Sequence, residues 1–85
     1  MTLFNFTLTV EGADILTDEA QNALFDAGCN DATFSASSGV QRGEFDRKAE
    51  EFAEAVATAI KAVESAVPGA RVVEMRRDDA PAASN

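Results

Sequence analysis

Apolar and polar side chains alternate along residues 3–11, and this period of two predicts a β-strand with one buried face. Residues 32–37 alternate in the same way. The Ser-Gly pair that follows is a turn signal, so we expect residues 40–45 to return as the second strand of a hairpin. Gly43 lies inside that strand and indicates a β-bulge or a close backbone approach.

Apolar side chains recur at helical spacing in two other segments. The first is residues 17–27, where we expect Thr17 to cap the N-terminus and Gly28 to supply the left-handed stop. The second follows Asp46, its expected N-cap, and ends before Pro68. The apolar stripe of this second helix consists of Ala49, Phe52, Ala53, Val56, Ile60, Val63 and Val67.

A last strand over residues 70–76, with Val73 and Met75 directed inward, completes the order βαββαβ. Because each strand has one apolar face and crossovers are right-handed, we expect an α+β, ferredoxin-like fold. It has a four-stranded antiparallel sheet with two helices on one face. Residues 1–77 are expected to form a single domain and residues 78–85 a flexible tail. The uncovered face of the sheet is expected to carry Asn5, Thr7, Thr9, Thr33, Ser35, Ser37, Arg42, Glu44, Val72, Glu74 and Arg76.

The composition fits one small globular domain. The chain has 85 residues, of which 46% are hydrophobic. It contains no apolar run long enough for a membrane span, and its start lacks the features of a signal peptide, so we expect a cytoplasmic protein (in the host cytoplasm if it is phage-encoded). A single cysteine, Cys29, forms no internal disulfide, which agrees with a reducing compartment.

The charge is strongly asymmetric. Fifteen Asp and Glu oppose seven Lys and Arg, which gives a formal net charge of -8. The first cation is Arg42, and six acids precede it. Such a protein repels nucleic acid and attracts cationic surfaces. The outward strand positions also lack the aromatic side chains that stack on bases, so we expect no direct nucleic-acid binding.

Few residues offer catalytic chemistry. The chain has no histidine, which removes the usual general base and the commonest zinc ligand. Cys29 follows a helix C-terminus, where the dipole raises the pKa of a thiol. The carboxylates lack the spacing of a calcium loop, and there is no glycine-rich phosphate loop. We therefore expect no enzyme activity, no metal and no cofactor.

The acids of the two helices have two interpretations that the sequence leaves open. One is a solvated acidic face that keeps a small protein soluble. The other is a surface that presents rows of anions to a cationic protein groove, in imitation of a nucleic-acid backbone. The long run without a cation favours the second, because solvated surfaces usually mix signs. Along the second helix, Arg47 is expected to pair with Glu51. The candidate partner-binding residues are Asp14, Asp18, Glu19, Asp26, Asp31, Glu50 and Glu54.

The stretch from Phe6 through Val73 resembles a domain at the N-terminus of some bacterial helix-turn-helix regulators. The pieces that carry the resemblance are FTLTVEG, the helix LTDEAQNALFDAGCNDATF, FDR at 45–47, and the run EAVATAIKAVESAVPGARVVEM. In those relatives a DNA-binding domain follows the last strand, whereas here a short tail follows. The resemblance rests on core and turn patterns, so it implies the fold rather than a function.

An acidic, freestanding copy of such a domain looks like a protein that acts by binding another protein. It is similar in type to phage-encoded anti-CRISPR proteins, several of which occupy the DNA-binding surface of a CRISPR effector complex. We therefore expect a non-enzymatic inhibitor whose partner is a cationic protein surface, such as a CRISPR effector subunit. The alternative is a regulator-derived module without its helix-turn-helix domain, which senses a small ligand or forms a homodimer.

Overall fold

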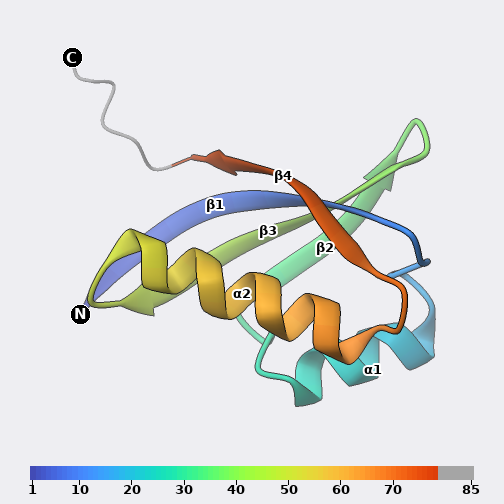
Figure 1. Cartoon of the computed structure of the whole chain (residues 1–85), viewed down its shortest axis with the longest axis horizontal. Coiled ribbons are helices and arrows are strands. Elements are labelled where there is room, and N and C mark those ends of the chain that lie inside the picture. Colours follow the sequence, from blue (N-terminus) through green and yellow to red (C-terminus); the bar gives the residue numbers. More distant parts are fainter. Residues whose placement is uncertain (79–85) are drawn as a thin grey trace.

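Four strands form one antiparallel sheet in the order β2-β3-β1-β4, and both helices cover the same face of it (Figure 1). The computed structural model describes residues 1–78. Its elements are β1 (Thr2–Glu11), α1 (Asp18–Asp26), β2 (Ala32–Ser37), β3 (Val40–Ala49), α2 (Phe52–Ala66) and β4 (Arg71–Arg77). The order βαββαβ and this sheet confirm the predicted α+β, ferredoxin-like fold.

The core lies between the sheet and α2. Phe6 of the central strand β1 is fully buried, stacks on Phe45 at 5.3 Å between ring centroids, and meets the edge of Phe52 at 5.8 Å. Small residues line the buried face of α2, including Ala55 and Ala59, and they let the helix approach the rings closely. Full burial of one such phenylalanine is worth about 1.5–3 kcal/mol, so these rings supply much of the core's stability.

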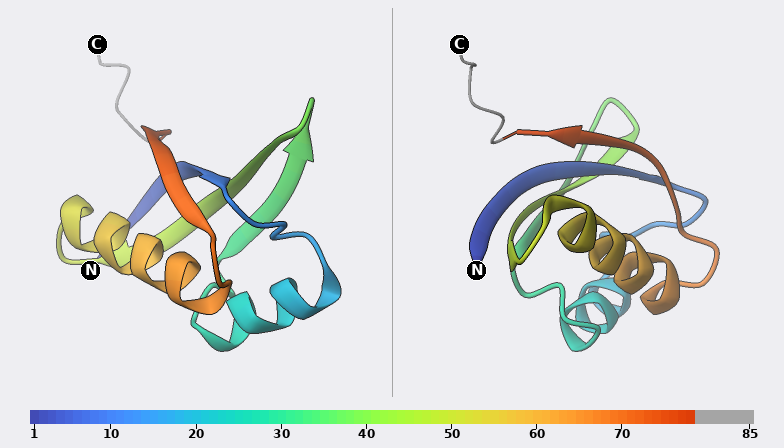
Figure 2. Two further views of the ribbon diagram at one scale, coloured as in Figure 1. Left: turned by 45° about the vertical axis from the view of Figure 1, so that its right-hand side comes forward. Right: turned by 60° about the vertical axis from the view of Figure 1, so that its left-hand side comes forward.

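α1 begins and ends as its sequence predicts. The side-chain oxygen of Thr17 accepts a hydrogen bond of 3.0 Å from the backbone N–H of Ala20, which caps the helix. At the other end Gly28 takes a φ of +98°, the left-handed conformation that favours glycine. Leu24 is buried, and α1 packs below α2 in the opposite direction (Figure 2).

The boundary between β3 and α2 differs from the prediction. Asp46 does not cap the second helix; it lies in β3 and pairs with Asn5 of β1. The ladder continues to Ala49 because β1 begins as early as Thr2, which gives the charged end of β3 a partner strand. α2 therefore begins at Phe52, and its N-cap residue makes no side-chain capping bond.

The direction of the side chains at the start of the last strand was also predicted wrongly. A β-bulge against β1 places Val73 opposite no residue, so the alternation shifts by one at that point. Val72 consequently packs against the core instead of facing outward. Val73, expected to face inward, is 48% exposed. Met75 lies opposite the buried Leu8, on the helical side as expected, and is 40% exposed at the sheet edge.

The uncovered face of the sheet otherwise carries the predicted residues, and its charges alternate. Thr7 lies between Glu44 and Arg76 in the strand register, and Thr9 lies between Arg42 and Glu74. These long side chains flank the two threonines, which are buried although no helix covers them. The open face is therefore a balanced array of opposite charges.

The first residue after β4 is also hydrogen-bonded to the sheet. The backbone N–H of Asp78 donates to the carbonyl oxygen of Asn5, and its Oδ1 pairs with Nε of Arg76 at 2.7 Å. The remainder of the expected flexible tail, residues 79–85, lies outside the described residues. Neither helix within residues 1–78 has the length and apolar character needed to cross a membrane.

Candidate protein-binding surface

The excess of acids belongs to the helical layer. Residues 12–31 and 50–70, which form the two helices and their flanking loops, carry nine acids and a single cation, Lys61. The four strands together carry four acids and six cations. The nine acids are Asp14, Asp18, Glu19, Asp26, Asp31, Glu50, Glu51, Glu54 and Glu64. Both helices lie on one face of the sheet (Figure 2), so the fold separates an acidic helical layer from a sheet with a small excess of cations.

Three of the candidate acids gather where α1 begins. Asp14 and Glu19 line one hollow of about 330 Å³, which residues 66–68 at the end of α2 close from the other side. Asp18 is the first residue of α1, beside Glu19. Asp14 is held in place, because its Oδ1 accepts a 2.9 Å hydrogen bond from the backbone N–H of Leu16. This end of the layer is the densest group of candidate carboxylates.

The other candidates lie apart from that group. Asp26 ends α1, and the next residue, Ala27, shares a groove with Lys61 of α2. Glu50 and Glu54 flank the start of α2, where the backbone N–H of Glu50 donates to Oε1 of Glu54 at 3.2 Å. The two helices run in opposite directions, so the start of α2 is remote from the start of α1 (Figure 1). The fold places the candidates on one layer without joining them into one cluster.

The acids of α1 differ in what they do for the helix. Asp18 and Glu19 occupy the first turn, where the helix dipole makes each anion favourable by about 0.3–1 kcal/mol. Their presence is therefore explained by helix stability alone. Asp26 occupies the last turn, which has no basic residue, and there the same dipole makes an anion unfavourable. Stability of the helix does not explain Asp26.

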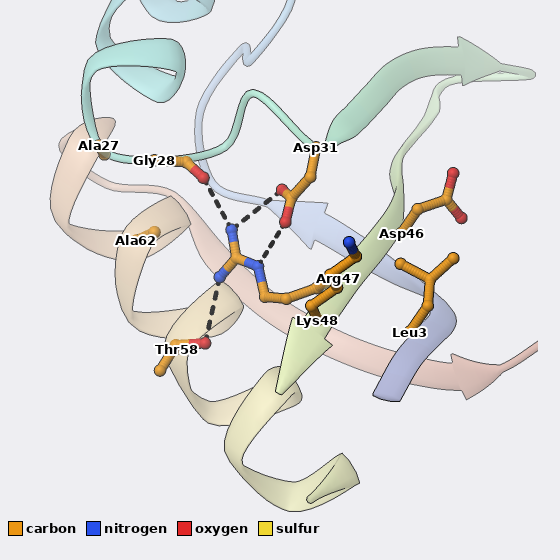
Figure 3. A pocket seen from close by; sticks show the side chains of 9 residues that line it. All are labelled: Leu3, Ala27, Gly28, Asp31, Asp46, Arg47, Lys48, Thr58 and Ala62. Carbon is orange, nitrogen blue, oxygen red and sulfur yellow. Dashed lines mark hydrogen bonds and ion pairs between the residues drawn. The ribbon is translucent and has the colours of Figure 1, made fainter. Parts of the chain in front are cut away.

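Among residues 1–78, Asp31 is the one candidate with a cationic partner, and that partner is Arg47 of β3. Nε of Arg47 lies 2.8 Å from Oδ2 of Asp31, and Nη2 lies 3.1 Å from Oδ1, so the pair is bidentate (Figure 3). Nη2 also donates to the carbonyl oxygen of Gly28 at 2.9 Å, and Nη1 donates to Oγ1 of Thr58 at 3.2 Å. The guanidinium thus joins three segments: β3 itself, helix α2, and the loop that precedes β2.

This network corrects the expected pair between Arg47 and Glu51. The Asp31 carboxylate, more than the burial that opposes it, raises the pKa of Arg47 above its ordinary value. This pair was missed in the sequence analysis, although the position of the hairpin turn sets a strand register that brings the two residues close together. Extending the β2–β3 register past Ala32 and Phe45 places Asp31 opposite Asp46, one residue from Arg47. Because Asp31 is neutralised, it is the weakest of the candidates for an external partner.

A hollow in the surface lies beside this network. It encloses about 610 Å³ and is lined by Leu3, Ala27, Gly28, Asp31, Asp46, Arg47, Lys48, Thr58 and Ala62 (Figure 3). Four of the five N–H groups of Arg47 already donate to protein atoms. The strongest polar group of the hollow is therefore committed to the fold.

Cys29 is buried beside the same network. Burial raises the pKa of its thiol, and the nearby Arg47 offsets this only in part. The thiol is therefore protonated at neutral pH, which is the unreactive form. Within residues 1–78, no three His, Cys, Asp or Glu side chains are grouped as metal ligands.

Comparisons of the chain with protein-family models, with curated proteins and with solved structures find no match. What defines this protein is its fold and its surface. It is a small α+β protein with an acidic helical layer on a sheet that has a small excess of cations.

Substitution of Arg47 tests the structural role of the network. Arg47→Met keeps the aliphatic stem but removes four hydrogen bonds, and it leaves Asp31 without its cation. We expect the free energy of unfolding to fall by about 2 kcal/mol, a value within the usual range for hydrogen bonds to charged groups. Urea denaturation measures the change. Arg71→Met, which removes the same charge from an exposed strand position, is the control and should cost much less. Equal losses in the two variants would contradict the assigned role.

Proposed function

We propose that this protein is a non-enzymatic inhibitor that binds a cationic surface of another protein through its acidic helical layer. The observation that carries the proposal is the confinement of the net charge of -8 to the helices and their loops. A protein that needs charge only for solubility has no reason to place all of the excess on one layer. Because Lys/Arg-rich surfaces commonly hold nucleic acid, the function that follows is competition with DNA or RNA.

The arrangement of α1 supports this proposal. Asp18 and Asp26 are eight residues apart on one exposed helix, which corresponds to a rise of about 12 Å. Successive cations of a partner can therefore contact both carboxylates at once. Within residues 1–78, neither of these acids nor Glu19 forms an ion pair. A CRISPR effector subunit is the candidate partner that the likeness to anti-CRISPR proteins implies.

The regulator-derived alternative has a different supporting observation, the open hollow beside Arg47. A small-ligand sensor would use this hollow, with Lys48 at its margin as the cation for an anionic ligand, since Lys48 forms no ion pair within residues 1–78. A ligand bound there would raise the melting temperature and would depend less on salt than a surface of exposed carboxylates. A metabolite thermal-shift screen distinguishes this alternative from the inhibitor.

Affinity capture at two ionic strengths tests the proposed function. We expect the immobilised protein to retain a cationic, nucleic-acid-binding protein at about 50 mM salt and to release it at about 500 mM, because screening weakens exposed ion pairs. The captured protein should lose its nucleic-acid binding while it is in the complex. Capture of a partner that resists high salt and has no basic surface would contradict the proposal.

A further inference from the structure

The outer edge of β2 is unprotected. β2 is an edge strand of the sheet, and within residues 1–78 no other strand pairs with its outer side (Figure 2). Proteins usually protect such edges with charges, prolines or bulges, because the free N–H and C=O groups recruit another strand. β2 has none of these three protections, whereas the opposite edge, β4, carries four charged residues and a bulge.

The sequence of β2 is self-complementary for an antiparallel pair. Around Phe34 the side chains read Ala, hydroxyl, Phe, hydroxyl, Ala in both directions. A two-fold axis through Phe34 therefore sets Thr33 opposite Ser35 of the second copy and Ala32 opposite Ala36. Directly opposite residues share a face, so hydroxyls meet hydroxyls and apolar groups meet apolar groups.

The neighbouring strand extends this match. In the β2–β3 register, Thr33 lies next to Glu44 and Ser35 lies next to Arg42. In the two-fold arrangement, four side chains would lie side by side across the strands on the uncovered face. Each such row would contain Glu44 and Thr33 of one copy, followed by Ser35 and Arg42 of the second copy. Each row then has opposite charges at its two ends. On the helical side, Phe34 packs edge-on against Phe45 at 5.9 Å and is partly buried, so a second Phe34 would continue the core.

We propose that two copies of this chain pair through β2, antiparallel and centred on Phe34, to form one continuous sheet. The two helical layers would then lie on the same side of that sheet, because the two-fold axis is perpendicular to it. Their acids repel each other at low ionic strength, so salt strengthens the dimer until this repulsion is screened. This response is opposite to that of the proposed inhibitor complex, so the two associations can be told apart.

Analytical ultracentrifugation of three proteins tests the proposal. The variant Thr33→Lys/Ser35→Lys would set like charges directly opposite each other at both ends of the paired strands, and both positions are exposed. We expect its dimer dissociation constant to rise at least tenfold over that of the unmodified protein. The control Asn22→Lys/Ser65→Lys adds the same charge at exposed helix positions and should dimerise as before or more tightly. A monomeric unmodified protein at about 0.5 mM, or an equal effect of both variants, would overturn the proposal.

Disulfide trapping tests the register without relying on the lysine variant. In a Cys29→Ala background, Phe34→Cys places the two thiols opposite each other, where the Cα atoms of a strand pair are about 4.5–5.5 Å apart and a disulfide can form. The matched control Thr33→Cys places its two thiols two residues out of register, beyond disulfide reach. We expect a covalent dimer on oxidation from the first variant only. Cross-linking of both to the same extent, or of neither, would contradict the centred pairing.

Discussion

Replacement of Gly12 by alanine is expected to lower the free energy of unfolding by about 3–4 kcal/mol, a large share of the stability of a small domain. Gly12 ends β1 with a φ of +92°, and a Cβ atom there would overlap the carbonyl oxygen of Gly69. The loop after β1 and the loop before β4 therefore touch backbone to backbone (Figure 1). An alanine forces these loops apart, and it weakens the pairing of Glu11 with Arg71 that follows the contact.

Gly28→Ala is the control that separates the clash of the new Cβ atom from the strain of a left-handed backbone at alanine. Gly28 has a similar φ of +98°, but a Cβ atom there would meet nothing within 4 Å. We expect this control to cost only the left-handed strain, about 1–2 kcal/mol. In thermal unfolding, Gly12→Ala should lower the melting temperature by roughly 15–25 °C and Gly28→Ala by less than half as much. Similar shifts in the two variants would mean that the two loops do not pack as described.

The second large effect concerns partner binding. Asp18→Lys, Glu19→Lys and Asp26→Lys together should weaken binding of the cationic partner on the order of 100-fold at low salt. This figure takes each reversal as roughly 1 kcal/mol, near the top of the range for exposed ion pairs. The loss should shrink as salt is added, because screening reduces each of these contributions. Isothermal titration calorimetry at two salt concentrations measures both effects.

A matched variant distinguishes a local surface from diffuse charge. Glu11→Lys, Glu44→Lys and Glu74→Lys change the net charge equally, but these three acids belong to the strands and are exposed there. We expect this variant to bind within a few fold of the unmodified protein. Circular dichroism of both triple variants checks that each remains folded. If the two variants lose affinity equally, the protein attracts its partner only through its total charge.

The sequence predicts the elements whose signals are local. Thr17 and Gly28 delimit α1 because capping and the left-handed stop depend on adjacent residues only. The alternation of residues 32–37 likewise predicts β2 with its observed bounds. Gly43 marks a close approach as expected, although the neighbour is the ring of Phe34 and the register there is regular.

The errors fall where a distant segment decides the local structure. The charged residues after Phe45 have the pattern of a helix start, but the first residues of β1 pair with them and extend β3. The bulge that exposes Val73 is a property of how β4 meets β1. The alternation within β4 alone therefore could not place Val72 in the core.

The acidic surface likewise has features that the sequence predicts and features that depend on distant segments. The composition predicts an excess of acids in the first half of the chain, and the predicted fold places them on helices. It does not show that Arg47 turns back to Asp31, because sixteen residues separate the two. Nor does it show that the sheet carries the excess of cations, since the four strands together have four acids and six cations.

Displacement of nucleic acid from the captured partner is the most direct test of the central claim. A labelled nucleic acid bound to that partner is titrated with the unmodified protein and with the two triple variants, and fluorescence anisotropy follows its release. We expect stoichiometric release by the unmodified protein and by the Glu11, Glu44 and Glu74 variant. We expect no release by the variant reversed at Asp18, Glu19 and Asp26. Retention of the nucleic acid at saturating unmodified protein would contradict the account of an acidic helical layer that occupies a nucleic-acid site.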